Sequence, residues 1–274
     1  MKSFGETIKG IRTARGITQS ELAGSLINRT TLSKIENSFE EPSYENATKL
    51  IKRLGITQIE FDYIRNDYQF NAKEQIIFDL FNIAYNSEVN KIASLLNRCE
   101  QFPNDQEIQK IKVILKAFNA SSLREARSLV IPLWKNQVSK TDNWNVLDLY
   151  LLNMIFFVFD DDTMIGISNR AIKTIEEKYP FLKSLETNFV LNKAAILMNR
   201  QNFDDAAMIL VKAITLAKAT FRYDKLLMAK GRLAICQKDK KEALYCLKVL
   251  KEIEADDVYN GLKDEIEQFD SRLS

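Results

Sequence analysis

Residues Thr18–Asn37, which read TQSELAGSLINRTTLSKIEN, constrain the fold more than any other part of the chain. Thr18 and Glu21 have the three-residue spacing of a capping box, which begins a helix. Gly24 can adopt a positive φ and end that helix. Asn28 can then cap a second helix. The stretch therefore predicts two short helices joined by a tight turn.

The second of these helices has two different faces. Leu32 and Ile35 are three residues apart and are expected to face the core. A charged and hydrogen-bonding stripe lies opposite, formed by Arg29, Thr30, Ser33 and Asn37. Contact with base edges in the major groove of DNA requires such a stripe on a short, capped helix. The alternative is an ordinary helical hairpin without a DNA role.

This region resembles the helix-turn-helix of the xenobiotic-response-element, or phage-repressor-like, family. The resemblance spans Phe4 to Ile64. Ser38 stands where that family usually has glycine, and a lengthened acidic link follows at residues 39–41. The matching positions are Arg12, Gly16, Thr18, Gln19, Glu21, Leu22, Ala23, Arg29, Ser33, Ile35, Glu36, Asn37, Pro42 and Ser43.

The resemblance and the helical geometry together assign roles to single residues. The resemblance implies a partly buried Arg12–Glu36 ion pair, the alternative being two solvated charges. It also implies that Gln19 binds a phosphate. Arg29, at the start of the second helix, is the best candidate for bidentate contact with guanine. The alternative for each DNA-contacting residue is a solvated polar side chain. The residues predicted to contact DNA are Gln19, Asn28, Arg29, Thr30, Ser33, Lys34 and Asn37.

Three further helices are expected in the first domain. One precedes Thr18 and runs from about Ser3 to Arg15. Another starts at Ser43 and stops at Gly55. Thr57 and Glu60 form a second predicted capping box, which begins the last of the five helices. Residues 1–67 are therefore predicted to form a five-helix, repressor-like helix-turn-helix domain.

Residues 68–274 are predicted to be helical throughout. The chain of 274 residues contains only 8 Gly and 4 Pro, too few for a β-rich or disordered chain. No Gly/Ser-rich linker separates the two domains. Helix breaks are expected near Asn86-Ser87, Pro103-Asn104, Ala120-Ser121, Thr141-Asp142, Asp160-Asp162, Pro180, Gln201-Asn202, Lys238-Asp239 and Ala255-Asp257.

Two segments of this domain repeat. Ala194 and Ala206 are twelve residues apart, and the same spacing of small residues recurs 37 residues later at Gly231 and Ala243. Small residues allow the two helices of a hairpin to approach closely. The pattern resembles tetratricopeptide repeats and predicts an α-solenoid of helical hairpins with a concave face. The alternative is a non-repetitive helical bundle.

A concave face of this kind is expected to bind an extended peptide. Asparagine side chains can donate to and accept from a peptide backbone, and methionine gives adaptable apolar pockets. The alternative for each residue is an ordinary place in the core. The residues predicted to bind peptide are Asn153, Asn188, Asn192, Met198, Met228 and Arg232.

The combination of these two domains resembles the Rgg/GadR/MutR group of regulators. The resemblance implies a cytoplasmic homodimer that binds a palindromic operator in double-stranded DNA and is controlled by a short signalling peptide. A palindromic operator has two half-sites, and each needs its own helix-turn-helix domain, here called a reading head. A dimer is therefore required on physical grounds as well. The alternative is a helical-repeat adaptor whose first domain only docks a partner protein.

Composition argues against several other classes of protein. The chain has no His and three widely spaced Cys, so neither a metal site nor a cofactor is expected. The sequence shows no nucleophile–base pair and no phosphate-binding Gly loop, which argues against an enzyme. Asp160, Asp161 and Asp162 are better explained as a helix cap. No signal peptide or membrane span is expected, so the predicted location is the cytoplasm.

Overall fold

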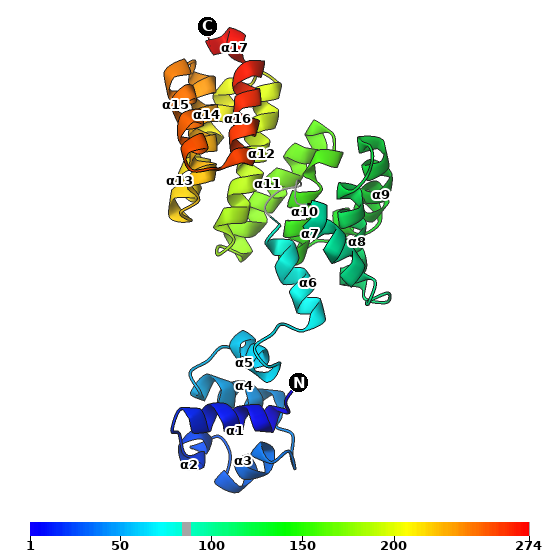
Figure 1. Ribbon diagram of the computed structural model, residues 1–274, viewed down its shortest axis with the longest axis vertical. Helices are drawn as coiled ribbons and strands as arrows, with labels where there is room; N and C mark the ends of the chain where they lie inside the picture. The colour runs from blue at the N-terminus through cyan, green and yellow to red at the C-terminus, as the bar shows by residue number, and fades with distance from the viewer. Residues whose placement is uncertain (84–88, 274) are drawn as a thin grey trace. The chain divides into compact units, whose positions relative to one another are not determined.

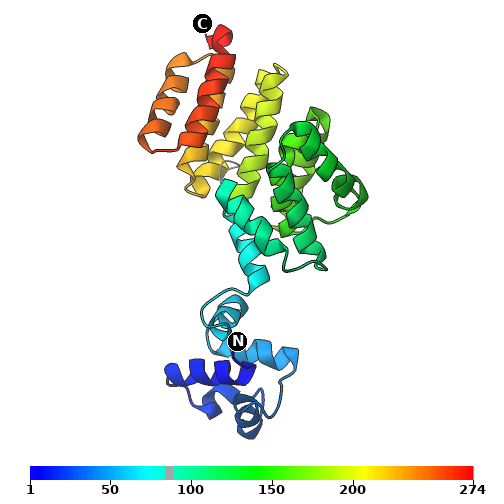
Figure 2. The same cartoon turned by 45° about the vertical axis from the view of Figure 1, so that its right-hand side comes forward.

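The computed structural model describes residues 1–83 and 89–273. Over these residues the chain forms seventeen α-helices and two short 3-10 helices, and no β-strand. It divides into two compact units, Met1–Asn82 and Ile83–Ser274 (Figures 1 and 2). The predicted all-α fold class is confirmed. The predicted domain boundary at residues 67 and 68 stays a prediction, and the expected break at Asn86-Ser87 lies outside the described residues.

The helices of unit 1 begin at the capping residues that the sequence predicts. Thr18, Ser43 and Thr57 each accept a hydrogen bond from a backbone N–H of the first turn. Asn28 also occupies an N-cap position, but its side chain makes no capping hydrogen bond, contrary to expectation. Glu60 does not complete the predicted capping box with Thr57 within this unit. The helices are α1 Phe4–Ala14, α2 Gln19–Ala23, α3 Arg29–Glu36, α4 Tyr44–Arg53, α5 Gln58–Arg65 and α6 Ala72–Phe81.

One hydrophobic core holds the first five helices together. Its members come from the apolar positions that the helical periodicity predicts, and helix α1 packs against both α3 and α5. Burial of these side chains fixes the orientation of α3. The core residues are Phe4, Ile8, Ile11, Leu22, Ala23, Leu32, Ile35, Leu50, Ile51, Leu54, Ile56 and Phe61.

Unit 2 is a series of helices in which each helix from α11 to α16 packs against the next (Figure 2). Asp160 caps α11, as predicted for that acidic cluster. The 3-10 helices are Val138–Lys140 and Phe156–Val158. The α-helices are α7 Val89–Cys99, α8 Gln106–Phe118, α9 Leu123–Asn136, α10 Val146–Met154, α11 Asp161–Lys178, α12 Lys183–Asn199, α13 Phe203–Ala219, α14 Tyr223–Gln237, α15 Lys240–Glu252, α16 Asp256–Gln268 and α17 Asp270–Leu273.

The repeated segments form two consecutive hairpins, α12–α13 and α14–α15. Ala194, Ala206 and Ala243 are fully buried at the contacts between helices. Gly231 is buried as well, and a Cβ atom there would lie 2.6 Å from Leu262 of α16. Alternate helices α10, α12, α14 and α16 also contact one another and form one layer of the solenoid. The residues predicted to bind peptide all belong to helices of this layer, which is called the α10–α16 layer below.

All three cysteines are buried thiols without a disulfide partner. Burial raises the pKa of both Cys236 and Cys246 to about 11. Such thiols stay protonated at neutral pH and are poor nucleophiles. None of the described helices is long and apolar enough to cross a membrane.

Candidate nucleic-acid interface

Helix α3 turns its polar residues outward. Arg29, Thr30 and Lys34 are exposed, and Ser33 is half-buried. Leu32 is completely buried on the opposite face. Among the described residues of unit 1, neither Arg29 nor Lys34 has an ion-pair partner. The cationic and hydroxyl groups of α3 are therefore available to an external acceptor.

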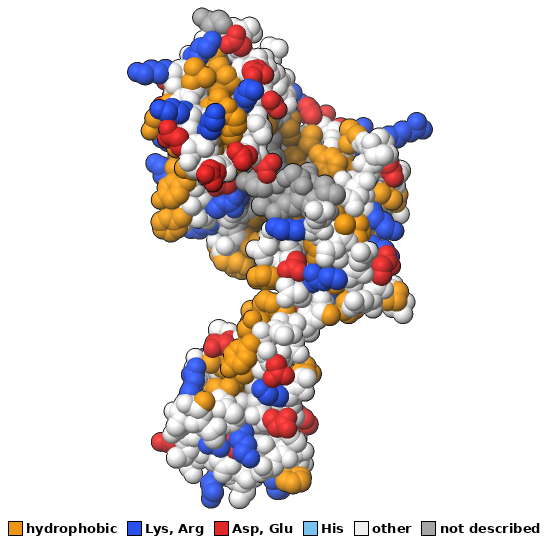
Figure 3. Space-filling model, in the orientation of Figure 1, with side chains coloured by type: hydrophobic (Ala, Val, Ile, Leu, Met, Phe, Trp, Pro, Cys, Tyr) orange, Lys and Arg blue, Asp and Glu red, His pale blue; other side chains and the backbone are white. Residues whose placement is uncertain are grey.

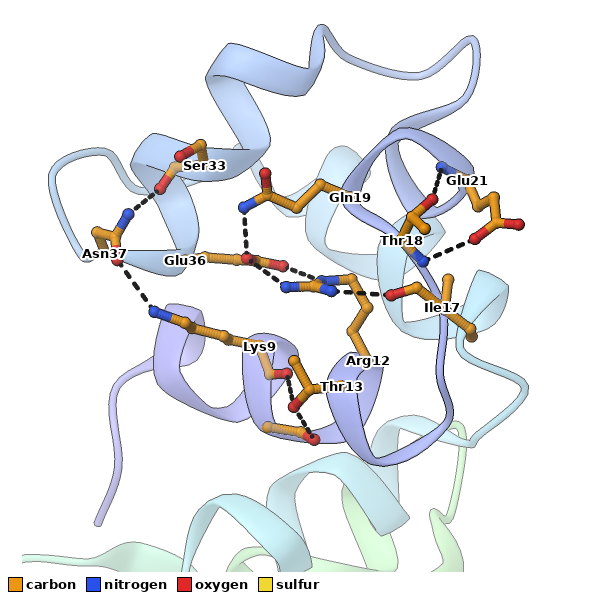
Figure 4. A network of polar contacts seen from close by, with 11 residues as sticks. Lys9, Arg12, Thr13, Ile17, Thr18, Gln19, Glu21, Ser33, Glu36 and Asn37 are labelled. Atoms are coloured by element: carbon orange, nitrogen blue, oxygen red, sulfur yellow. Dashed lines mark hydrogen bonds and ion pairs between the residues drawn. The ribbon is translucent and has the colours of Figure 1, made fainter.

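A buried ion pair fixes α3 against α1 (Figure 4). Arg12 donates through Nε to Oε1 of Glu36 at 2.5 Å and through Nη2 to Oε2 at 2.9 Å. Arg12 Nη1 also donates to the carbonyl oxygen of Ile17 at 2.8 Å. The Glu36 carboxylate raises the pKa of the Arg12 guanidinium above its usual value, chiefly through this hydrogen bonding. The pair therefore joins α1, and the turn that holds Ile17, to the end of α3.

Two residues predicted to contact DNA are engaged within unit 1. Gln19 donates from Nε2 to Oε2 of Glu36 at 2.8 Å, so one of the two N–H groups of the Gln19 amide is already bonded. Asn37 accepts a hydrogen bond from Lys9 at 3.2 Å and donates to the carbonyl oxygen of Ser33 at 2.8 Å (Figure 4). Both side chains are thereby held in fixed orientations. The helical spacing showed their positions but not the bonds to Glu36 and Lys9, which join residues 17 and 28 positions apart in sequence.

The beginning of α3 is open to an anion. Because the Asn28 side chain makes no cap, it leaves the N–H groups of the first helical turn without a side-chain acceptor. Such N–H groups, together with the helix dipole, favour a phosphate or other anion. Asn28 and Arg29 are both exposed at this end. An anion could thus bind where Arg29 enters the helix.

On the face shown in Figure 3, charge is mixed rather than concentrated. The face shown in Figure 3 carries basic and acidic side chains interspersed over both units, in line with a formal net charge of +2. Binding to a polyanion would therefore depend on a small number of placed cations instead of a broad basic surface.

All three asparagines that are predicted to bind peptide lie on helices of the α10–α16 layer of unit 2. Asn188 and Asn192 are one turn apart on α12, and both are half-buried. Asn153 lies on α10, and its buried Oδ1 has no hydrogen-bond partner among the described residues. An unsatisfied buried acceptor costs about 1–3 kcal/mol, which a ligand N–H group or a water molecule would recover. The structure thus places these three amides on adjacent helices of one layer.

The other three residues predicted to bind peptide pack in or against the helix contacts of unit 2. Met198 is only 1% exposed and packs in the hydrophobic core of unit 2. Arg232 is buried and donates to both carboxylate oxygens of Glu265, at 2.8 and 2.6 Å, and to the carbonyl oxygen of Leu191. Met228 is half-buried against the same core. Helical spacing alone did not reveal that Met198 and Arg232 point into the helix contacts.

One charged residue of the α10–α16 layer, Lys225, carries no signal in the sequence. Lys225, in the first turn of α14, donates to the backbone and side-chain oxygens of Ser184 on α12, at 3.0 and 3.1 Å. Burial and then the neighbouring Arg222 lower its pKa to about 8. No local motif surrounds Lys225, so only the packing of α12 against α14 reveals its contact with Ser184.

Comparison with known families agrees with the geometry of unit 1. Residues 8–60 match the model of the helix-turn-helix family. Unit 1 contains a helix-turn-helix domain. At the level of sequence, no curated protein matches the chain.

Solved structures share the fold of the whole chain. A protein from Listeria monocytogenes EGD-e has a TM-score of 0.75 at 17% identity, covering 98% of this chain and 97% of its own. The pheromone receptor Rgg2 of Streptococcus dysgalactiae has a TM-score of 0.70 at 19% identity, covering 97% and 99%. ComR from S. thermophilus, solved with DNA and its signalling peptide ComS, has a TM-score of 0.64 at 18% identity, covering 97% and 99%. The helix-turn-helix followed by a helical-repeat unit is therefore the architecture of these proteins.

Proposed function

We propose that this protein is a sequence-specific DNA-binding transcriptional regulator. The observation that carries the proposal is the exposed polar face of α3, with Arg29 and Thr30 presented outward. The buried Arg12–Glu36 pair holds that helix in a fixed orientation. The structural likeness to ComR, which was solved bound to DNA, supports the same function. A regulator that acts on operators must reach the chromosome, so we place it in the cytoplasm.

We further propose that the protein acts as a homodimer controlled by a short signalling peptide. One head reads only half of a palindromic operator, so two copies are needed. The proposed peptide contacts are Asn153, Asn188 and Asn192 on the α10–α16 layer of unit 2. A peptide controls DNA binding only if it binds two shapes of the dimer with different affinity. Rgg2 and ComR, each described with a pheromone or signalling peptide, support this part of the proposal.

The DNA-reading role of Arg29 can be tested with an operator selected from random DNA by the purified protein. Arg29→Ala should lower the preference for the selected operator over altered operators by about 1–3 kcal/mol, because a bidentate contact with a base is lost. Lys34→Ala is the matched control. It should weaken binding to all sequences alike and lower the salt dependence by about one phosphate contact. Unchanged preference in Arg29→Ala would exclude Arg29 as the reader.

The peptide proposal needs a separate measurement. A genomic footprint of the protein identifies its operators and the short reading frames beside them, which encode candidate peptides. Operator affinity should change when the cognate synthetic peptide is added, and Asn192→Ala should remove that change. The adaptor alternative predicts something different, namely no DNA binding even at low salt.

A further inference from the structure

A pocket of about 190 Å³ lies in unit 2 between α11, α12 and α13. It has room for about six water molecules, so it is smaller than the cavities of about 300–1,000 Å³ that hold drug-sized ligands. A molecule of roughly six to eight non-hydrogen atoms would fill it. The lining residues are Asn169, Ile172, Lys173 and Glu176 of α11, Val190 and Lys193 of α12, and Ile209 and Lys212 of α13.

This pocket is separate from the face on which a peptide is proposed to bind. Val190 follows Asn188 by two residues, a rotation of about 200° around the axis of α12, and so points to the opposite side of that helix. The other two lining helices, α11 and α13, lie outside the α10–α16 layer. A ligand in this pocket would therefore leave the amides of Asn188 and Asn192 free.

Three apolar side chains form the base of the pocket. Val190 is only 1% exposed and belongs to the hydrophobic core of unit 2. Ile172 and Ile209 are partly buried and pack against that core. Apolar atoms of a ligand that covers this base are removed from water, which favours binding.

The rim of the pocket carries cations whose charges are neutralised to different extents. Lys212 forms ion pairs with Glu176 of α11 at 2.7 Å and with Glu186 of α12 at 2.6 Å. Lys193 is half-buried and has no ion-pair partner among the residues that the structure describes. Its Nζ donates to Oδ1 of Asn169 at 2.7 Å, which leaves two of its three N–H groups for a ligand. Lys193 is thus a positioned cation without a counter-charge.

The charges of the rim restrict the charge of the ligand. A cation would be repelled by Lys193, and a dianion such as phosphate would be repelled by Glu176. Phosphate would also leave the apolar base without a contact. Lys173, the third lysine of the rim, is exposed and lies 3.9 Å from Glu177 of its own helix. A monoanion with an aliphatic chain matches both the unpaired cation and the apolar base.

We propose that this pocket binds a small aliphatic monocarboxylate of about six carbon atoms. The ligand carboxylate accepts charge-assisted hydrogen bonds from Lys193, and its carbon chain covers Val190, Ile172 and Ile209. Either an amino acid with an aliphatic side chain or a plain carboxylic acid supplies this chemistry. An amino acid has an ammonium group as well, which the Glu176 carboxylate would accept.

Isothermal titration calorimetry of the full-length protein with isocaproate, which is leucine without its amino group, tests the proposal. Saturable binding of one isocaproate per chain is expected. Lys193→Gln should weaken it about tenfold, a loss equivalent to about 1.4 kcal/mol. Lys241→Gln, which removes an exposed lysine of α15 outside the pocket, is the matched control and should leave the affinity unchanged. Acetate lacks the aliphatic chain and isohexyl alcohol lacks the charge, so both should bind more weakly than isocaproate.

Two further titrations distinguish the sources of the ligand. Leucine that binds more tightly than isocaproate, with an advantage that is lost in Glu176→Gln, would identify an amino acid. Tighter binding of isocaproate or α-ketoisocaproate would identify a carboxylic acid.

Several results would overturn the proposal. They are no saturable binding of either isocaproate or leucine, equal binding by Lys193→Gln and the wild type, and equal binding of isohexyl alcohol and isocaproate. Asn192→Ala should bind isocaproate normally, and a loss there would place the ligand on the α10–α16 layer instead. These titrations need no DNA, so their outcome is independent of whether the protein binds an operator.

Discussion

At the scale of single residues, unit 1 depends on a charge pair that water hardly reaches. The Arg12 side chain is 10% exposed and that of Glu36 is 0% exposed. Moving two ions out of water is costly, and the loss of either partner leaves the other charge buried and uncompensated. Gln19 adds a third donor to the same carboxylate. Glu36 is thus the acceptor on which three elements converge.

Removal of this acceptor should destabilise unit 1. Glu36→Ala is expected to lower the free energy of unfolding of unit 1 by about 3–5 kcal/mol, because Arg12 stays buried without a counter-charge. Hydrogen exchange of peptides from residues 1–37 measures this locally. Fluorescence of Trp134 and Trp144 reports on unit 2 in the same samples and should not change. Glu41→Ala, an exposed control, should alter the free energy by less than about 0.5 kcal/mol.

The opposite outcome is equally clear. If Glu36→Ala and Glu41→Ala exchange hydrogen at the same rates over residues 1–37, the pair contributes nothing to stability. The fixed orientation of α3 would then have to come from burial of Leu32 and Ile35 alone.

At the scale of elements, the contact between α1 and α3 is set by one glycine. A Cβ atom on Gly5 would lie 1.9 Å from the carbonyl oxygen of Ile35, which belongs to the backbone of α3. A backbone atom cannot move aside as the end of a flexible side chain can. Gly5 therefore determines how closely the reading helix approaches α1, whereas Gly10, in the same helix, has no atom within 4 Å of its Cβ position.

Alanine at these two glycines should act in opposite directions. Gly5→Ala is expected to destabilise unit 1 by about 3 kcal/mol, because α3 must shift away from α1. Gly10→Ala should stabilise it by about 0.5–1 kcal/mol, since alanine is the better helix former. Urea denaturation followed by circular dichroism measures both changes. Similar stability of the two variants would show that the approach of α3 is not tight.

At the scale of the whole molecule, the proposed function requires two copies of α3 on one duplex. Dimeric helix-turn-helix proteins bind half-sites whose centres are about one helical turn apart, or a multiple of it. Each head must then meet the same face of the DNA. Only a dimer requires a fixed spacing between half-sites, because a single helix-turn-helix domain binds one half-site.

Changes in operator spacing test this requirement. Insertion of about 5 bp between the half-sites should abolish tight binding, because the second half-site then faces the opposite side of the duplex. Insertion of about 10 bp should restore part of the affinity. Gel-shift titration of the three fragments measures the effect. Equal affinity for all three, or for a single half-site, would contradict a two-headed regulator.

Local sequence signals predicted the elements of the fold and many of the positions in the site. The cap of α2 at Thr18 and the stop at Gly24 depend on residues within one turn of each other, so the sequence shows them directly. The exposed stripe of α3 follows from helical periodicity in the same way. Two capping predictions were wrong: the Asn28 side chain makes no cap, and Glu60 does not complete the box with Thr57.

The amino-acid sequence by itself thus determined an all-α chain, the helix-turn-helix and the repeated hairpins, because each arises from neighbours three, four or twelve residues apart. Tertiary structure alone decided which polar side chains stay open to a ligand. Met198 and Arg232 lie in helix contacts with residues far along the chain, and Glu36 binds Gln19 across 17 residues. Side-chain exposure depends on the packing of distant helices, which a periodic pattern does not contain.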